Sequence, residues 1–136
     1  MKSKILLTII FLVFITVTGY SQVYKNRAKQ LAYKSKDNYG RWTKWSDWED
    51  CNILIVTNLD NSKFTIYSKV TQEFDIIKFY PKEYDDEGVE VFRILVVDKD
   101  GLRCNIRQRF IKSEYFSSQM YIDYADFIYV YNLTSN

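Results

Sequence analysis

The stretch that decides the fold is VEVFRILVVDKDGLRCNIRQRFI, residues 89–111. Two strand-forming runs, 89–97 and 102–111, flank the tetrapeptide Asp98-Lys99-Asp100-Gly101. Glycine adopts a positive φ without steric cost, so this tetrapeptide is typical of a hairpin turn. In the second run polar residues alternate with apolar ones, as in a strand with one face against a core. The stretch therefore predicts two antiparallel neighbours.

The same period of two recurs on both sides of this hairpin. We expect further strands at 53–57, 64–68, 74–80, 120–124 and 127–133, with turns at 58–62 and 125–126 and a polar loop at 82–88. Pro81 ends the third of these runs, since proline cannot donate to a ladder. Residues 23–34 fit a helical face as well as a strand. We interpret them as a first strand followed by a turn near 37–40.

Short links between consecutive strands predict a meander. The chain is therefore expected to be all-β, with residues 22–136 forming a single domain of seven or eight antiparallel strands. Such a meander closes into a small barrel or folds into a two-layer sandwich, because open edges invite aggregation. The sequence leaves both architectures open.

Residues 1–21 have the pattern of a cleavable signal peptide. Lys2 and Lys4 precede an uncharged run at 5–17, and the small residues Gly19 and Ser21 stand before a cleavage site at Gln22. The run is shorter than the roughly 20 apolar residues that span a bilayer. We expect a secreted or periplasmic protein with no membrane span after cleavage.

Charge argues against a nucleic-acid partner. The chain has 19 basic and 17 acidic residues, and removal of the leader with its two lysines leaves the remainder formally neutral. Residues 22–48 nevertheless hold seven basic side chains against only Asp37 and Asp47. Two interpretations stay open: a solvated basic strand, or a surface for an anionic partner such as a polysaccharide or a membrane.

The residue inventory does not favour catalysis. Histidine is absent, which removes the commonest general base and zinc ligand, and no phosphate loop or metal-ligand cluster is recognisable. We expect no enzyme, no metal and no cofactor.

The only cysteines, Cys51 and Cys104, lie on the apolar side of their own alternations. Outside the cytoplasm they form either a disulfide or two buried thiols.

All three tryptophans fall in one short motif, Trp42-x-x-Trp45-x-x-Trp48-x-x-Cys51. The motif resembles the tryptophan ladder of thrombospondin type 1 repeats, in which tryptophans stack against arginines of a neighbouring strand. The resemblance is confined to residues 42–51, and the rest of that family's cysteine framework is absent, so we infer no membership. It implies that arginines of the alternating run could stack on the tryptophans. These arginines are Arg103, Arg107 and Arg109.

Two interpretations of the tryptophans compete. They cover the core, or they lie exposed with Tyr39 as a platform for sugar rings. The function we predict is a non-enzymatic binding or interaction module whose partner is a glycan or another exported protein. The alternatives are a carbohydrate-binding or lipocalin-like ligand-binding protein, a small carbohydrate-active enzyme and a structural envelope component.

Overall fold

The computed structural model describes residues 22–135. The signal peptide predicted at residues 1–21 lies outside the described residues. Within residues 22–135 no helix is long and apolar enough to cross a membrane.

The described residues form nine strands and no helix. The strands are β1 (Val23–Ser35), β2 (Glu49–Asn58), β3 (Lys63–Tyr67), β4 (Thr71–Phe79), β5 (Glu83–Tyr84), β6 (Glu90–Asp98), β7 (Arg103–Arg109), β8 (Ser118–Asp123) and β9 (Phe127–Ser135). The hairpin predicted at 89–111 is β6 and β7, and Gly101 at its turn has a φ of 82°. The all-β prediction is confirmed.

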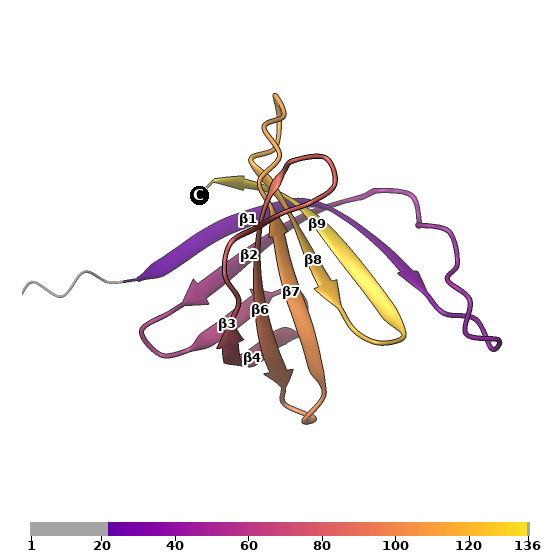
Figure 1. The fold of residues 1–136 in the computed structure, drawn as a ribbon, viewed down its shortest axis with the longest axis horizontal. Helices are drawn as coiled ribbons and strands as arrows, with labels where there is room; N and C mark the ends of the chain where they lie inside the picture. The colour runs from indigo at the N-terminus through magenta and orange to yellow at the C-terminus, as the bar shows by residue number, and fades with distance from the viewer. Residues whose placement is uncertain (1–21, 136) are drawn as a thin grey trace, which may run out of the picture.

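The strands close into a barrel, which decides between the two predicted architectures. Eight strands follow one another as antiparallel neighbours, and the first and last of them, β1 and β9, also pair. The short β5 is not a member of this ring: it pairs only with the first residues of β6, and β4 pairs directly with the later residues of β6. Figure 1 shows the strands surrounding a common interior, with the segment after β1 extending away from the barrel on one side. No strand of the closed ring is left with a free edge along its whole length.

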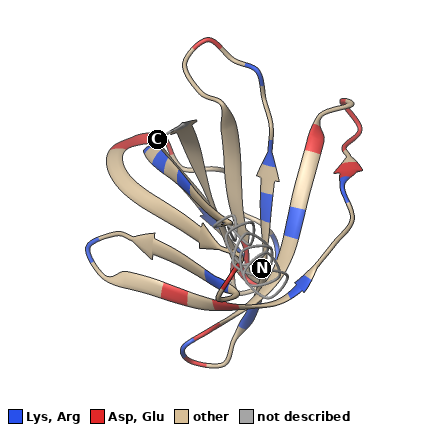
Figure 2. Cartoon of the chain, turned by 90° about the vertical axis from the view of Figure 1, so that its left-hand side faces the viewer, with Lys and Arg blue, Asp and Glu red and all other residues tan. Residues whose placement is uncertain are grey.

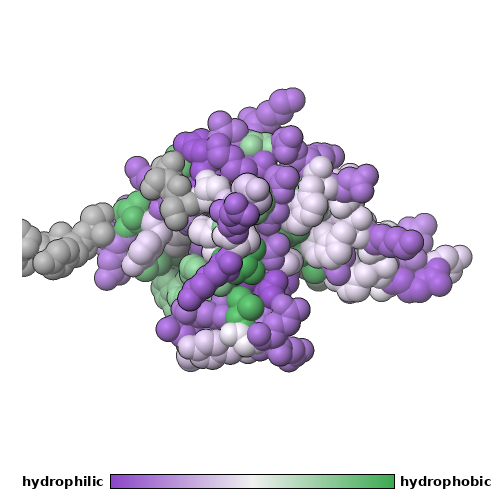
Figure 3. Space-filling model, turned by 90° about the horizontal axis from the view of Figure 1, so that it is seen from above, coloured by the Kyte–Doolittle hydropathy of each residue, from purple (hydrophilic) through white to green (hydrophobic). Residues whose placement is uncertain are grey.

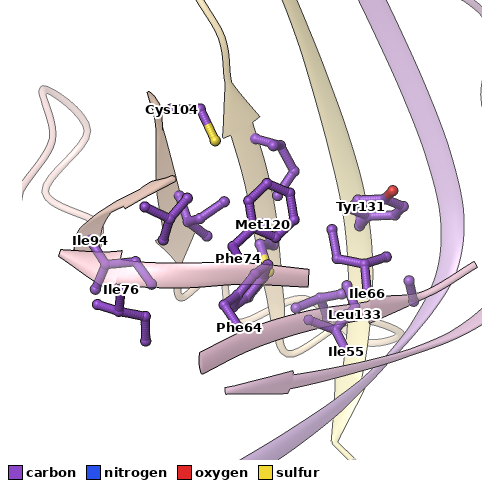
Figure 4. Close-up of a cluster of buried hydrophobic side chains, with 14 residues drawn as sticks. Ile55, Phe64, Ile66, Phe74, Ile76, Ile94, Cys104, Met120, Tyr131 and Leu133 are labelled. Atoms are coloured by element: carbon purple, nitrogen blue, oxygen red, sulfur yellow. The ribbon is translucent and has the colours of Figure 1, made fainter. Parts of the chain in front are cut away.

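The barrel interior is packed at its waist. The largest fully buried side chains include Phe64 and Phe74, whose rings meet edge to face with centroids 5.8 Å apart. Figure 4 shows these two rings in the centre of the cluster, with isoleucines from several strands around them. Burying a side chain of this size contributes roughly 2–3 kcal/mol. The waist is therefore the part of the barrel that stabilises the fold most.

A bulge in β1 explains why its sequence pattern is ambiguous. Pairing shifts between Ala28 and Gln30: Lys29 is an extra residue relative to β9, and β2 has the extra residue in its pairing with β1. Ala28 and Leu31 consequently both pack in the core although three positions separate them. That spacing is typical of a helix face, yet here it comes from a strand with a bulge.

Candidate functional site

A tight turn follows β1 and reverses the chain at residues 37–41. The Asp37 carboxylate accepts hydrogen bonds from the N–H groups of Tyr39 and Arg41, at 2.9 and 3.0 Å. These bonds, led by the one from Arg41, hold the pKa of Asp37 below its usual range. Gly40 has a φ of 75°, which a side chain would strain. The turn predicted near 37–40 is therefore present, and it starts the return segment that carries the tryptophans.

The return segment, residues 42–48, is here called the tryptophan strap. It runs beside β1 without forming a regular strand. The N–H groups of Thr43 and Ser46 each donate to a β1 carbonyl, those of Ser35 and Tyr33, at 2.8 Å. The hydroxyls of the same two strap residues accept from the N–H groups of Ser35 and Tyr33, at 3.1 and 2.9 Å. Four hydrogen bonds thus fix the position of the strap.

Lysines of β1 and the adjoining turn lie against the strap's indole rings. The Lys34 Nζ lies 5.2 Å from the ring centroid of Trp42 and 4.7 Å from that of Trp45. Lys36 Nζ lies 5.2 Å from the Trp42 ring. These are cation–π distances. The cations against the tryptophans are lysines from the preceding strand, where the sequence resemblance implied arginines.

The inner side of the strap covers the outside of the barrel wall. Trp45 reaches Tyr121 on β8, with ring centroids 6.2 Å apart. Tyr121 pairs with Val130, which in turn pairs with Ala32 of β1, so the Trp45 ring extends across β9. Val130 and Ala32 are 3% and 2% exposed although they stand outside the core cluster. The strap and its neighbours form a small second layer on the barrel.

The outer side of the strap stays open to solvent. Trp42, Trp45 and Trp48 are 41%, 42% and 45% exposed, and Tyr39 at the turn is 83% exposed. Seen from above in Figure 3, side chains of intermediate hydropathy cover much of the side on which the chain projects. Trp45 therefore both covers the wall and presents surface, so each of the two competing interpretations describes part of its environment.

The three candidate arginines have different surroundings. Arg107 lies 4.3 Å from the Tyr121 ring centroid and forms an ion pair with Asp123, so it reaches the strap through Tyr121. Arg109 lies farther along β7 and pairs with the 83–88 loop. Arg103 is exposed at the start of β7. Within residues 22–135, only lysines make a cation–π contact with a strap tryptophan.

Residues 83–88, here called the acidic loop, pack on the wall through Arg109. The Arg109 Nε lies 2.8 Å from Asp85 Oδ2, and its Nη2 lies 3.3 Å from Glu87 Oε2. Asp85 also accepts from the N–H groups of Val89 and Glu87, and the Val89 bond contributes most to the lowered pKa of Asp85. The described residues contain no group of three or more side chains placed to hold a metal ion.

The two cysteines are free thiols. Of the two alternatives that the sequence left open, the structure has the two thiols and no disulfide between Cys51 and Cys104. Cys104 is buried, and this burial raises the pKa of its thiol to about 12. Cys51 is half-buried and its Sγ lies 3.6 Å from the carbonyl oxygen of Ala28. Neither has the lowered pKa of a reactive cysteine.

Sequence reasoning missed the hollows at the two ends of the barrel. The end at which β1 begins, here called the first mouth, contains a cavity of about 490 Å³. The opposite end, the second mouth, has a hollow of about 380 Å³. The sequence signal is a set of polar residues at inward positions near each mouth, among them Asn26 and Gln108 at the first and Gln72 at the second.

No family model, no curated protein and no solved structure matches this chain.

Proposed function

We propose that the chain is an exported, non-enzymatic binding module that holds an acidic glycan against the tryptophan strap. The observation that carries this proposal is the row of indoles, each between 41% and 45% exposed, on a segment fixed by hydrogen bonds to β1. A surface that is already ordered loses little conformational entropy when a ligand binds.

The aromatic part of the strap suits sugar rings. The C–H faces of a sugar stack on indole, and rings spaced three residues apart can contact successive sugars of a chain. Trp48 adds a third indole at the end nearest β2, and Tyr39 adds an exposed ring at the turn. An extended polymer therefore matches the strap better than a single small sugar does.

The charged part of the strap favours an acidic polymer. Residues 22–48 carry seven basic side chains against two acidic ones, and Lys34 and Lys36 lie directly at the rings. A carboxylate or sulfate on the sugar can pair with these ammonium groups while its ring stacks on indole. Elsewhere Figure 2 shows basic and acidic residues interspersed along the ribbon. Two of the seven basic side chains, Lys34 and Lys36, thus lie at the aromatic surface.

The proposal is tested by calorimetric titration of the protein with polygalacturonate, alginate and neutral dextran. We expect the two acidic polymers to bind, dextran to bind weakly, and added salt to lower the affinity. Trp42→Ala should weaken binding roughly tenfold, the size of effect found for an interface hot spot. The matched control is Tyr84→Ala, which removes an aromatic ring that is 65% exposed on the acidic loop.

Two results would overturn the proposal. One is a flat response to all three polymers from protein whose circular dichroism shows the folded β-barrel. The other is equal loss of affinity in the Trp42 and Tyr84 variants, because binding would then not depend on the strap.

A further inference from the structure

We propose that the first mouth of the barrel is a second binding site, which takes a compact apolar molecule bearing a hydroxyl group. This site lies apart from the strap and does not depend on the glycan proposal. Its volume of about 490 Å³ falls within the range of roughly 300–1,000 Å³ that small-molecule pockets occupy.

The floor of the cavity is the packed waist of the barrel. Phe64, Ile94, Ile106 and Met120 line it, and each is at most 2% exposed. Phe64 is in turn supported by its edge-to-face contact with Phe74. A floor built from such side chains is rigid, since protein cores are packed as densely as organic crystals. A ligand therefore enters an existing hollow and does not have to open the core.

The upper wall of the cavity leaves apolar surface uncovered. Leu59 and Phe92 line it, and the more exposed Tyr24 and Phe110 stand at its rim, 58% and 40% exposed. Apolar residues in this position gain free energy when a ligand displaces water from them, by roughly 25 cal/mol for each Å² covered. An apolar ligand body fits this lining.

The polar residues that line the cavity, Asn26, Thr57 and Gln108, point to a ligand whose functional group forms hydrogen bonds. Gln108 is an inward-facing residue of β7 that lines the cavity. Its amide nitrogen donates to the Ser118 hydroxyl at 3.0 Å. Among the hydrogen bonds of the described residues, none ends on the amide oxygen of Gln108. A ligand hydroxyl can donate to this oxygen, and an aliphatic chain cannot.

A carboxylate at the rim sets the preferred charge. Glu90 lines the cavity and its Oε1 lies 3.4 Å from Lys82 Nζ, an ion pair with both side chains about half exposed. Exposed pairs of this kind hold their partners weakly. Lys25 also belongs to the lining, but it alternates outward on β1, whereas Glu90 alternates inward with Phe92 and Ile94. Glu90 therefore disfavours an anionic head group inside the mouth, so we expect an alcohol to bind in preference to a fatty acid.

Competition for N-phenyl-naphthylamine, a neutral apolar fluorophore, tests the site with three matched ligands. Decanol should displace the fluorophore roughly tenfold better than decane, because decane leaves the Gln108 oxygen unpaired. Decanol should also displace it better than decanoate. Equal potency of decanol and decane, or a preference for decanoate, would overturn the proposed ligand class.

Two variants and a control at the opposite mouth locate the site. Gln108→Leu should lower the preference for decanol over decane, and Glu90→Gln should raise the potency of decanoate. The control is Gln72→Leu, because Gln72 donates to the Ser68 hydroxyl at 3.2 Å and lines the hollow of the second mouth. If Gln108→Leu does not fold, the decanoate potency of Glu90→Gln, a substitution at the rim, still tests the site. An unchanged decanoate potency in that variant, or an equal effect of Gln72→Leu, would overturn the site.

Discussion

The tryptophan strap and the acidic loop both fold back over the outside of the barrel, and they differ in what they leave open. Each covers aliphatic side chains that point away from the core: Ala32 and Val130 under the strap, and Val91 near the acidic loop. The strap is held by hydrogen bonds of its backbone and of two hydroxyls, and by lysines in cation–π contact with its rings. The acidic loop is held by the pairing of β5 with β6 and by ion pairs, of which those to Arg109, a residue that is 17% exposed, join it to β7.

The difference shows which kind of packing leaves a surface able to bind. In the acidic loop the charged groups that fix the segment are already paired, because Arg109 binds both Asp85 and Glu87 and also donates to Gln119. These groups are therefore not free to bind a ligand. In the strap the fixing bonds use the main chain and two side-chain hydroxyls and none uses an indole, so each indole keeps part of its surface exposed. A segment whose anchoring bonds leave its aromatic rings unused can present those rings, whereas charged side chains that anchor a segment are not free to bind a ligand.

The largest effect that we expect is from Trp45→Ala. More than half of this side chain is buried, against Tyr121 and the wall. Loss of roughly 100 Å² of buried apolar surface should lower the free energy of unfolding by about 2–3 kcal/mol. Urea denaturation followed by circular dichroism measures this.

Trp45→Ala also tests the difference between the strap and the acidic loop. It should weaken acidic-glycan binding, since the strap loses both a ring and its support. If stability is unchanged, the strap does not form the second layer on the barrel that its contacts with Tyr121 indicate.

Arg109→Met should have the next largest effect. Methionine keeps much of the aliphatic stem but leaves Asp85 and Glu87 without their cation, and hydrogen bonds to charged groups contribute roughly 1.5–3 kcal/mol. We expect a loss of about 2 kcal/mol in unfolding free energy with glycan affinity nearly unchanged. Arg103→Met, at an exposed site on the same face of β7, is the control for the change of charge. Equal loss of glycan affinity in the Trp45 and Arg109 variants would show that strap and loop act as one unit.

The sequence predicted the strands well because the barrel has one buried face. Alternation in 102–111 correctly placed Cys104 and Ile106 inward and Arg107 and Arg109 outward. The start of β2 was set four residues too late, since Glu49 and Asp50 are exposed and do not alternate. Closure of the barrel depends on the pairing of β1 with β9, two strands that are distant in sequence, and periodicity carries no information about such pairs.

The surroundings of the candidate site were harder to predict, for a physical reason. Whether an indole is open depends on what lies under it, and Ala32 and Val130 reached that position through a bulge and a long-range pairing. Their outward apolar side chains are the only sign in the sequence that a segment covers them. The cysteines illustrate the same limit, because matching inward parity does not bring two thiols within bonding distance across a barrel.

A smaller effect on the free energy of unfolding is expected when the pH is lowered. Hydrogen bonds from the Val89 and Glu87 N–H groups and the Arg109 guanidinium lower the pKa of Asp85. A carboxylate whose folded pKa is lowered stabilises the protein above its unfolded pKa of about 3.9, and this stabilisation is lost as pH falls through the folded value. Stability should therefore fall below about pH 4, and Asp85→Asn should make that fall shallower. Urea midpoints across acidic pH measure it, with Asp126→Asn as control. An unaltered slope would mean that the ion pair adds nothing to the loop.

The smallest effect is expected from Tyr39→Ala at the tip of the turn before the strap. The ring is 83% exposed, and its one described ring contact is with Arg41, at 5.2 Å. Its removal should change unfolding free energy by less than about 0.5 kcal/mol, as for most surface substitutions. Glycan affinity should fall by only about twofold, because this ring lies beyond the segment that β1 holds in place. A loss as large as that in Trp42→Ala, measured by the same calorimetry, would move the centre of the binding surface to the turn. Anchoring to β1 would then not be what prepares the strap to bind.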